Sequence, residues 1–259
     1  MNKKIDKEQV RRRFAKHLEA YDSLAVVQQQ IAATLAGYFS VYAPARFGTV
    51  LEVGCGTGFL TRELVKIGGM EKLYLNDLVP EALPALEKRL GEEGCFVQVG
   101  LLPGDAEQID IPQEADLIAS ASAMQWFEDL DGFLAKTAAA LKPGGWLVFN
   151  LFGPENLRQV RELTGSGLDY LPAGELRRLL EKHVEIVALR EETIRQTFDT
   201  PFDVLRHLQQ TGVTATGEFR WTPGSLRTFE REYTVRYGRN GKVHLDWEVV
   251  YVIARKPGI

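Results

Sequence analysis

The sequence is poor in cysteine and has no long apolar run. Only Cys55 and Cys95 occur among its 259 residues, so a disulfide framework is not expected and a reducing cytoplasm suits the chain. No stretch reaches the roughly 18 apolar residues that a transmembrane helix needs. The N-terminus is charged from Lys3 onward, which is not typical of a signal peptide. We therefore expect a cytoplasmic protein without membrane contacts.

An excess of positive charge is also missing. The net charge is −4, so no general basic field points to a nucleic acid partner. The histidines form no cluster with carboxylates or cysteines at metal-ligand spacing, so no metal site is expected. The first twenty residues are an exception, because Lys and Arg outnumber Asp and Glu there. Such a segment is typical of a solvated helix face, or of a surface that docks an acidic partner.

Short apolar runs alternate with amphipathic segments in the middle of the chain. We expect buried strands at 49–54, 72–77, 96–102, 115–122 and 145–152. Helices are expected between them, with Pro80 in the first turn of the helix at 79–90. Strands that are apolar throughout are typical of parallel sheets buried on both faces. The pattern therefore predicts an α/β fold with helices on both sides of a parallel sheet.

Further helical segments precede and follow this region. Apolar residues at helical spacing favour helices within residues 6–43. Behind the core we expect helices at 154–164, 172–182, 201–212 and 223–238, and strands at 184–198 and 245–256. No linker divides the chain, so a single domain over residues 1–259 is predicted. Its expected parts are a helical lid segment (1–45), a cofactor-binding core (46–152), and a C-terminal half (153–259) with a helical insertion at about 199–238.

The segment "LEVGCGTGF" (51–59) carries the strongest chemical signal. Gly54, Gly56 and Gly58 lie between an expected strand and an expected helix, where glycine lets a ligand approach the backbone closely. The dinucleotide fingerprint would require a third glycine at position 59, where this chain has Phe59. Cys55, inside the loop, is interpreted as a small filler rather than a nucleophile.

With Glu52 in front of it, this loop resembles the first motif of the S-adenosylmethionine-dependent methyltransferases with a seven-stranded Rossmann-like sheet. Asp77 at the end of the second strand, "GDAEQI" (104–109) and "LKPGGWLVF" (141–149) fit the same resemblance. The resemblance implies S-adenosylmethionine as methyl donor and S-adenosylhomocysteine as product, with Asp77 on the ribose hydroxyls and Asp105 on the adenine amino group. The implied cofactor-binding residues are Glu52, Gly54, Cys55, Gly56, Thr57, Gly58, Asp77, Leu78, Asp105, Ala106, Ser120, Ala121 and Gln28.

A narrower resemblance covers nearly the whole chain. The segments at 10–32, 122–130 ("SAMQWFEDL") and 202–215 are similar to those of the malonyl-[acyl-carrier protein] O-methyltransferases of biotin synthesis. The resemblance implies that a malonyl thioester on acyl carrier protein becomes the methyl ester that starts pimeloyl and biotin synthesis. Two positions depart from the family pattern. Ala121 stands where an Asn is common, and Pro223 follows Thr222 where an Arg is frequent.

The residues that would contact the acceptor follow from the chemistry. A carboxylate with a reference pKa around 4 is already ionised at neutral pH, so methyl transfer to it needs no general base. Arg206 is predicted to hold this carboxylate through its bidentate guanidinium, with Arg227 as second choice. Tyr21 and Gln28 are predicted to close over cofactor or substrate, and Trp126 to form a pocket wall. Each also has a plainer interpretation as a core, capping or surface residue.

The implied partner, acyl carrier protein, is acidic. We expect it to dock on basic residues either at Arg11, Arg12 and Lys16 or at Arg177 and Arg178. The enzyme itself is expected to be a monomer.

Three alternatives stay open at this point. A methyltransferase for free small-molecule acids or hydroxyls would share every cofactor residue. A non-catalytic cofactor-binding regulator would also keep them. A nicotinamide-dependent dehydrogenase is opposed by Phe59 and by the lack of a proton-relay group.

Overall fold

The chain folds around one twisted sheet in the computed structural model, which describes residues 5–44, 46–95, 97–212 and 221–258. The strands are β1 (Arg46–Val53), β2 (Gly69–Asp77), β3 (Gln98–Pro103), β4 (Ala115–Ser120), β5 (Leu141–Phe152), β6 (Glu185–Phe198), β7 (Gly238–Arg239) and β8 (Lys242–Arg255). The helices are α1 (Lys7–Leu24), α2 (Val26–Ser40), α3 (Phe59–Ile67), α4 (Ala82–Glu92), α5 (Leu130–Ala140), α6 (Arg158–Thr164), α7 (Ala173–Leu180), α8 (Pro201–Gln210) and α9 (Pro223–Tyr237). None of the helices in the described ranges is long and apolar enough to cross a membrane.

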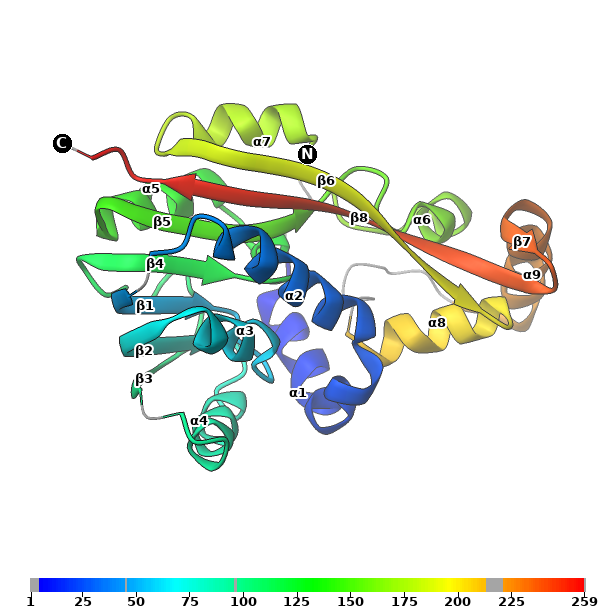
Figure 1. The fold of residues 1–259 in the computed structure, drawn as a ribbon. Coiled ribbons are helices and arrows are strands. Elements are labelled where there is room, and N and C mark those ends of the chain that lie inside the picture. The colour runs from blue at the N-terminus through cyan, green and yellow to red at the C-terminus, as the bar shows by residue number, and fades with distance from the viewer. Residues whose placement is uncertain (1–4, 45, 96, 213–220, 259) are drawn as a thin grey trace.

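The main sheet has seven strands in the order β3-β2-β1-β4-β5-β8-β6 (Figure 1). Strands β1 to β5 pair in parallel, whereas β8 runs antiparallel to both β5 and β6. The two-residue strand β7, which the sequence did not predict, pairs with β8 at one end. The chain proceeds from β1 outward to β3 and then returns to β4 on the other side of β1. The predicted α/β fold is thus confirmed, and its switch point between β1 and β4 is where such sheets bind ligands.

Helices cover the sheet on both faces because successive strand residues point to opposite sides. Val50 packs in a cluster with α2, α3 and α4, whereas its neighbour Leu51 packs in a second cluster with α5 and α7. This is the alternation that a strand buried on both sides produces. The element boundaries differ slightly from expectation. Pro80 lies in a turn two residues before α4 rather than in its first turn, and β8 begins at Lys242 instead of residue 245.

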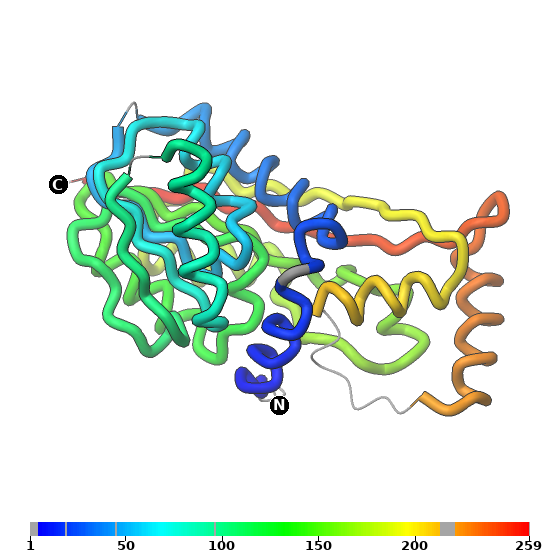
Figure 2. The backbone as a smooth tube through the Cα atoms, turned by 90° about the horizontal axis from the view of Figure 1, so that it is seen from below, coloured from blue at the N-terminus to red at the C-terminus, as the bar shows by residue number. Residues whose placement is uncertain are grey.

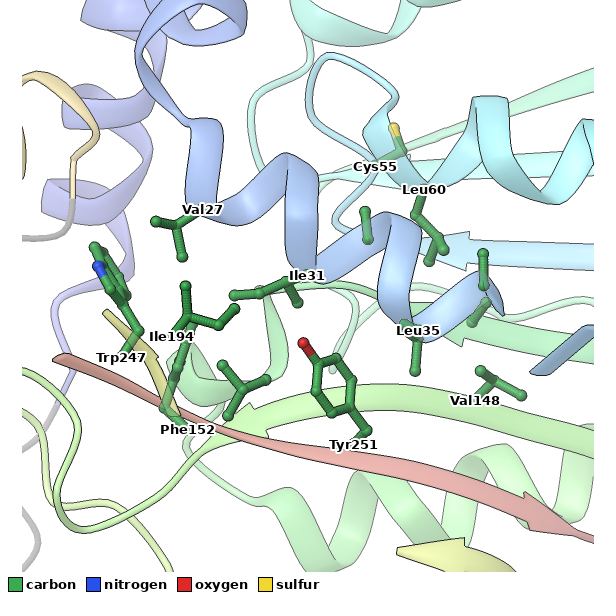
Figure 3. Packing of buried hydrophobic residues seen from close by; sticks show 14 of the residues in the cluster. Val27, Ile31, Leu35, Cys55, Leu60, Val148, Phe152, Ile194, Trp247 and Tyr251 are labelled. Atoms are coloured by element: carbon green, nitrogen blue, oxygen red, sulfur yellow. The ribbon is translucent and has the colours of Figure 1, made fainter. Parts of the chain in front are cut away.

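The second helix, α2, lies across one face of the sheet and anchors the N-terminal segment. Figure 3 shows Val27, Ile31 and Leu35 on its lower side, directed toward Phe152 and Tyr251 of the strands beneath. Ile31 and Leu35 are completely buried, so α2 belongs to the core. The helix before it, α1, is more exposed and runs beside the carboxyl ends of the central strands (Figures 1 and 2).

Strands β6 and β8 extend well beyond the rest of the sheet. Pairing of β5 with β8 ends at Phe152 and Val249, but β6 and β8 continue through six further pairs, which is roughly 20 Å. The helices α8 and α9 are attached to this two-stranded ribbon (Figure 2). Each begins with a capping box and a proline, at Thr200 and Pro201 and at Thr222 and Pro223.

Candidate functional site

The glycine loop after β1 has the backbone conformation that its sequence demands. Gly54, Gly56 and Gly58 all have positive φ, at 68°, 52° and 89°. A Cβ on Gly54 would approach the Cβ of Ala123 to 2.3 Å, and one on Gly58 would meet Leu86 at the same distance. A Cβ on Gly56 would meet nothing within 4 Å. Gly54 and Gly58 therefore permit close packing, while Gly56 leaves its backbone open to a ligand.

Asp77, at the end of β2, is tied to this loop. Its carboxylate accepts hydrogen bonds from the backbone N–H groups of Gly56 (2.7 Å) and Val79 (2.7 Å). Burial raises the pKa of Asp77, while these two backbone donors lower it. Each carboxylate oxygen keeps a further lone pair, as required for an acceptor of two vicinal hydroxyls.

Glu52, shortly before the loop glycines, is a buried carboxyl group that forms no ion pair with a described residue. Its side chain is in contact with the cavity, and its Oε2 has no hydrogen-bond partner among the described residues. Burial raises the pKa of Glu52 to about 8, and the nearby Asp77 adds to the rise. A buried carboxyl group of this kind favours a cationic ligand group beside it.

Asp105, after β3, already has a charged neighbour from α1. Lys7 Nζ lies 2.6 Å from Asp105 Oδ2 and also contacts Glu107. The turn that carries Asp105 is fixed by Asn76, whose Nδ2 donates to the carbonyls of Leu102 and Gly104. The N-terminal end of α1 is therefore tied to the same turn as the predicted adenine contact.

These groups border one cavity at the carboxyl ends of β1, β2 and β4. It encloses about 1060 Å³, its open mouth included, which is the size range of cofactor pockets. Most of the residues predicted from the sequence line it, namely Tyr21, Gln28, Glu52, Gly54, Cys55, Gly56, Thr57, Asp77, Leu78, Asp105, Ala106, Ala121 and Trp126. Gly58 and Ser120 do not line the cavity. Gly58 is the N-cap of α3, and the Ser120 hydroxyl donates to the carbonyl of Val53 at 2.9 Å.

A smaller inner pocket of about 360 Å³ adjoins this cavity. Five residues line both spaces, namely Phe14, Tyr21, Gln28, Ser122 and Trp126. The remaining lining of the inner pocket is Gln125, Phe152, Asn156, Leu168, Tyr170 and Trp247. No charged side chain belongs to this lining in the described parts of the chain.

The structure does not bring Arg206 to either space. Its side chain on α8 is 65% exposed, and its guanidinium lies 3.1 Å from Asp203, one turn earlier on the same helix. Arg227 on α9 is exposed as well and lines neither space. The described residues of the insertion are likewise absent from both linings, whereas α1 contributes Lys7, Val10, Arg11, Phe14, Leu18 and Tyr21.

Several lining residues were missed because their sequence signal is that of ordinary core residues. Phe14 was not among the predicted site residues, but it packs edge-on against Tyr21 (6.1 Å) and Trp126 (6.2 Å). Phe59 stacks on Tyr21 with an angle of 26° between the rings. Ser122 has a φ of 54°, which nothing in the local sequence indicates. Only the fold brings these residues together.

Two other kinds of chemistry, a nucleophilic thiol and a metal site, find no support among the described residues around the cavity. Cys55 is a free, buried thiol whose pKa is raised by burial and by Asp77 and Glu52, so it is a poor nucleophile. No group of three potential metal ligands is found in the described ranges.

Comparisons with known sequences agree on one enzyme class. The family described as a methyltransferase domain matches residues 51–149. The malonyl-[acyl-carrier protein] O-methyltransferase of Haemophilus ducreyi is 36% identical over 253 residues, which cover 98% of each chain. The protein of that name from Bacteroides helcogenes is 38% identical over 275 residues, covering 97% of this chain and 99% of that one.

Solved structures share the fold. The YcgJ protein of Bacillus subtilis matches with a TM-score of 0.62 at 15% identity, covering 87% of this chain and 99% of that one. Phosphoethanolamine N-methyltransferase 2 of Haemonchus contortus, solved with S-adenosylmethionine, matches with a TM-score of 0.54 at 16% identity, covering 86% and 52%. Identities this low speak for the architecture alone.

Proposed function

Because the chain belongs to the family of malonyl-[acyl-carrier protein] O-methyltransferases, we propose that it methylates the free carboxylate of a malonyl thioester on acyl carrier protein. The methyl donor in this proposal is S-adenosylmethionine, and the product is the malonyl methyl ester from which biotin synthesis starts. The observation that carries the proposal is the junction of two spaces, a cofactor-sized cavity beside the glycine loop and an uncharged inner pocket next to it.

The residues of the larger cavity fit the proposed methyl donor. S-adenosylmethionine, when bound, supplies a methyl group on a sulfonium that is ready for transfer. Glu52 offers an unpaired buried carboxyl oxygen to a cationic group, and Gly56 leaves its backbone open. Asp77 and Asp105 stand at the ends of β2 and β3, where they suit ribose hydroxyls and the adenine amino group. Leu78, Ala106 and Ala121 complete the wall.

The inner pocket suits an acceptor that needs no deprotonation. No histidine, lysine or acid of the described chain lines it, so no general base is available there. A malonyl carboxylate is ionised at neutral pH and requires none. Phe14, Tyr21 and Trp126 surround the junction with aromatic rings, which exclude water while the acceptor and donor are held in line.

Of the two basic clusters that could dock the carrier protein, we favour the one on α1. Arg12 and Lys16 are exposed on the helix whose inner face lines the cavity. Arg177 and Arg178 lie on α7, which packs on the opposite face of the sheet. An acidic carrier on α1 would thus deliver its thioester arm close to the junction.

The test is an assay of the full chain with S-adenosylmethionine labelled at the methyl group and malonyl-acyl carrier protein. We expect a labelled methyl ester that mild base releases as methanol. Equal turnover of free malonate or malonyl-coenzyme A would instead indicate a methyltransferase for free acids. Binding of the donor without methylation of any of these acceptors would indicate a non-catalytic cofactor-binding protein.

A further inference from the structure

The junction between the two spaces is where the acceptor oxygen has to meet the methyl donor. Only residues that line both spaces can contact an atom in this position, and in the described chain these are Phe14, Tyr21, Gln28, Ser122 and Trp126. Two of them, Gln28 and Trp126, come from segments almost a hundred residues apart that the fold places side by side.

Both residues carry buried polar atoms without partners. Trp126 is 7% exposed and its indole N–H donates to no described group. Gln28 is 5% exposed, its Oε1 is unpaired, and its amide N–H groups donate to no described group. Native proteins seldom leave such groups unsatisfied, because each costs about 1–3 kcal/mol. The unpaired indole N–H of Trp126, a residue that lines both spaces, therefore points to a bound acceptor.

The indole is held rigidly in this position. Trp126 ends the 3-10 turn Met124–Trp126, in which its backbone N–H donates to Ala123 O at 3.1 Å. The preceding Ser122 is fixed by a hydrogen bond from its N–H to Asn150 Oδ1 at 2.9 Å. Phe14 packs edge-on against the indole. Trp126 thus presents a preorganised donor, which loses little entropy when a ligand binds.

We propose that the acceptor carboxylate is held at this junction by two neutral donors, the Trp126 indole N–H and the Gln28 side-chain amide, and by no cation. This assignment rests on the proposed function and concerns the acceptor half of the same site. It replaces Arg206, which is exposed and paired with Asp203.

The charge balance of the reaction favours neutral donors. One carboxylate oxygen forms the new O–CH₃ bond, the S–CH₃ bond breaks, and its electron pair goes to sulfur, so that anion and sulfonium both become neutral. No proton moves. A guanidinium would stabilise the reactant carboxylate more than the transition state, in which that negative charge is disappearing. Neutral N–H groups orient the carboxylate oxygen and stabilise the reactant over the transition state less than a guanidinium would.

The first experiment compares Trp126→Phe with the parent enzyme. The variant keeps an aromatic ring and loses the N–H, so kcat/KM for malonyl-acyl carrier protein is expected to fall about 10- to 100-fold. The Kd for S-adenosylmethionine is expected to change less than about threefold. Trp146→Phe is the matched control and should keep the parental kinetics. Trp146, on β5, packs against Phe39 and Arg255 and lines neither space.

The second experiment uses the pH dependence of Gln28→Glu. At a pH below its pKa, the new carboxyl group is protonated and can donate a hydrogen bond to the acceptor carboxylate. At a pH above its pKa, the new carboxylate faces the acceptor carboxylate and repels it. The activity of Gln28→Glu relative to the parent should therefore fall as pH rises, and Gln28→Met should show a loss that does not vary with pH. A purely structural role of Gln28 would not produce this difference.

The outcomes separate the two proposals. A parent enzyme that does not methylate malonyl-acyl carrier protein overturns the proposed function. An active parent together with an equally active Trp126→Phe overturns only the neutral-donor assignment. Should Trp126→Phe fail to fold, the pH profiles of the Gln28 variants decide, and a Gln28→Glu profile parallel to the parent's overturns the assignment.

Discussion

The residues singled out from the sequence differ in how deeply they are buried and in whether their charged groups are paired. Glu52 and Arg206 are the clearest contrast, because the first is buried with one carboxyl oxygen unpaired and the second is paired at the surface. Both were singled out from the sequence for a role in binding. Their different environments lead to different expected responses to mutation.

Glu52 should make the stability of the protein depend on pH. Its pKa is about 8 in the folded state against 4.5 in the unfolded chain, so between these values the folded protein holds a proton that the unfolded chain has released. The free energy of unfolding therefore falls as pH rises, by up to roughly 1.4 kcal/mol per unit. Glu52→Gln removes this slope.

Urea denaturation of the parent and Glu52→Gln at pH 5 and pH 8 tests this expectation. The stability of Glu52→Gln relative to the parent should be greater at pH 8 than at pH 5. A difference in unfolding free energy that is the same at both pH values would show that Glu52 does not retain its proton in the folded protein.

Arg206→Ala should cost little activity. Exposed ion pairs such as Arg206–Asp203 contribute less than about 1 kcal/mol, and the guanidinium lines neither space. We expect kcat/KM for malonyl-acyl carrier protein within about threefold of the parent, measured beside Trp126→Phe. A loss of tenfold or more with unchanged donor affinity would return the role of carboxylate ligand to Arg206.

At the scale of elements, α1 is the helix that forms the outer wall of the cavity. Its apolar face was predicted from spacing, but the structure adds a polar anchor at one end. Lys7 joins α1 to Asp105 and Glu107, which lie some hundred residues later in the chain. An ion pair thus joins the first turn of α1 to a turn that is distant in the sequence.

Lys7→Met should loosen the first turns of α1 without unfolding the sheet. Loss of a partly buried pair worth about 1 kcal/mol predicts amide exchange in this part of α1 faster by roughly three- to tenfold. Hydrogen exchange measured by mass spectrometry would detect it. Arg12→Met is the control, since among the described residues Arg12 pairs with Glu8 alone, on the same helix. Equal protection in parent and Lys7→Met would mean that aromatic packing alone holds α1.

At the scale of the whole molecule, the helices on the two sides of the sheet differ in whether they line the cavity. Helices α1, α2 and α3 contribute side chains to the cavity, whereas no described residue of α5 or α7 lines it. The face with α5 and α7 is closed by apolar packing. The long ribbon of β6 and β8 carries α9 away from the central strands, whereas α8 runs back from the ribbon to α1 (Figures 1 and 2). The carrier protein is therefore expected on the α1 side.

Charge reversal on α1 tests this arrangement. The double variant Arg12→Glu, Lys16→Glu should lower kcat/KM for malonyl-acyl carrier protein about tenfold at low salt, with a smaller loss at high salt because the attraction is screened. The affinity for S-adenosylmethionine should stay unchanged. The double variant Arg177→Glu, Arg178→Glu is measured alongside, and a larger effect there would move the docking surface to α7.

The sequence by itself determined the sheet and the turns that border the larger cavity. The reason is that these features are local: a buried strand, a glycine turn and an acid at a strand end each occupy a few consecutive residues. The parallel order then places the ends of β1, β2 and β4 at one edge. These local patterns, together with the resemblance to the methyltransferases, singled out Glu52, Gly56, Asp77 and Asp105, and the fold places all four at the cavity.

Only the tertiary structure decided the acceptor side. The junction is assembled from α1, α2 and the turn after β4, and no short segment contains more than a part of it. Gln28 and Trp126 were named from the sequence, but their position at the junction was not, and the direction of Arg206 depends on Asp203 and the exposed face of α8. Side chains of this kind acquire their roles from long-range packing and desolvation, which local sequence patterns do not encode.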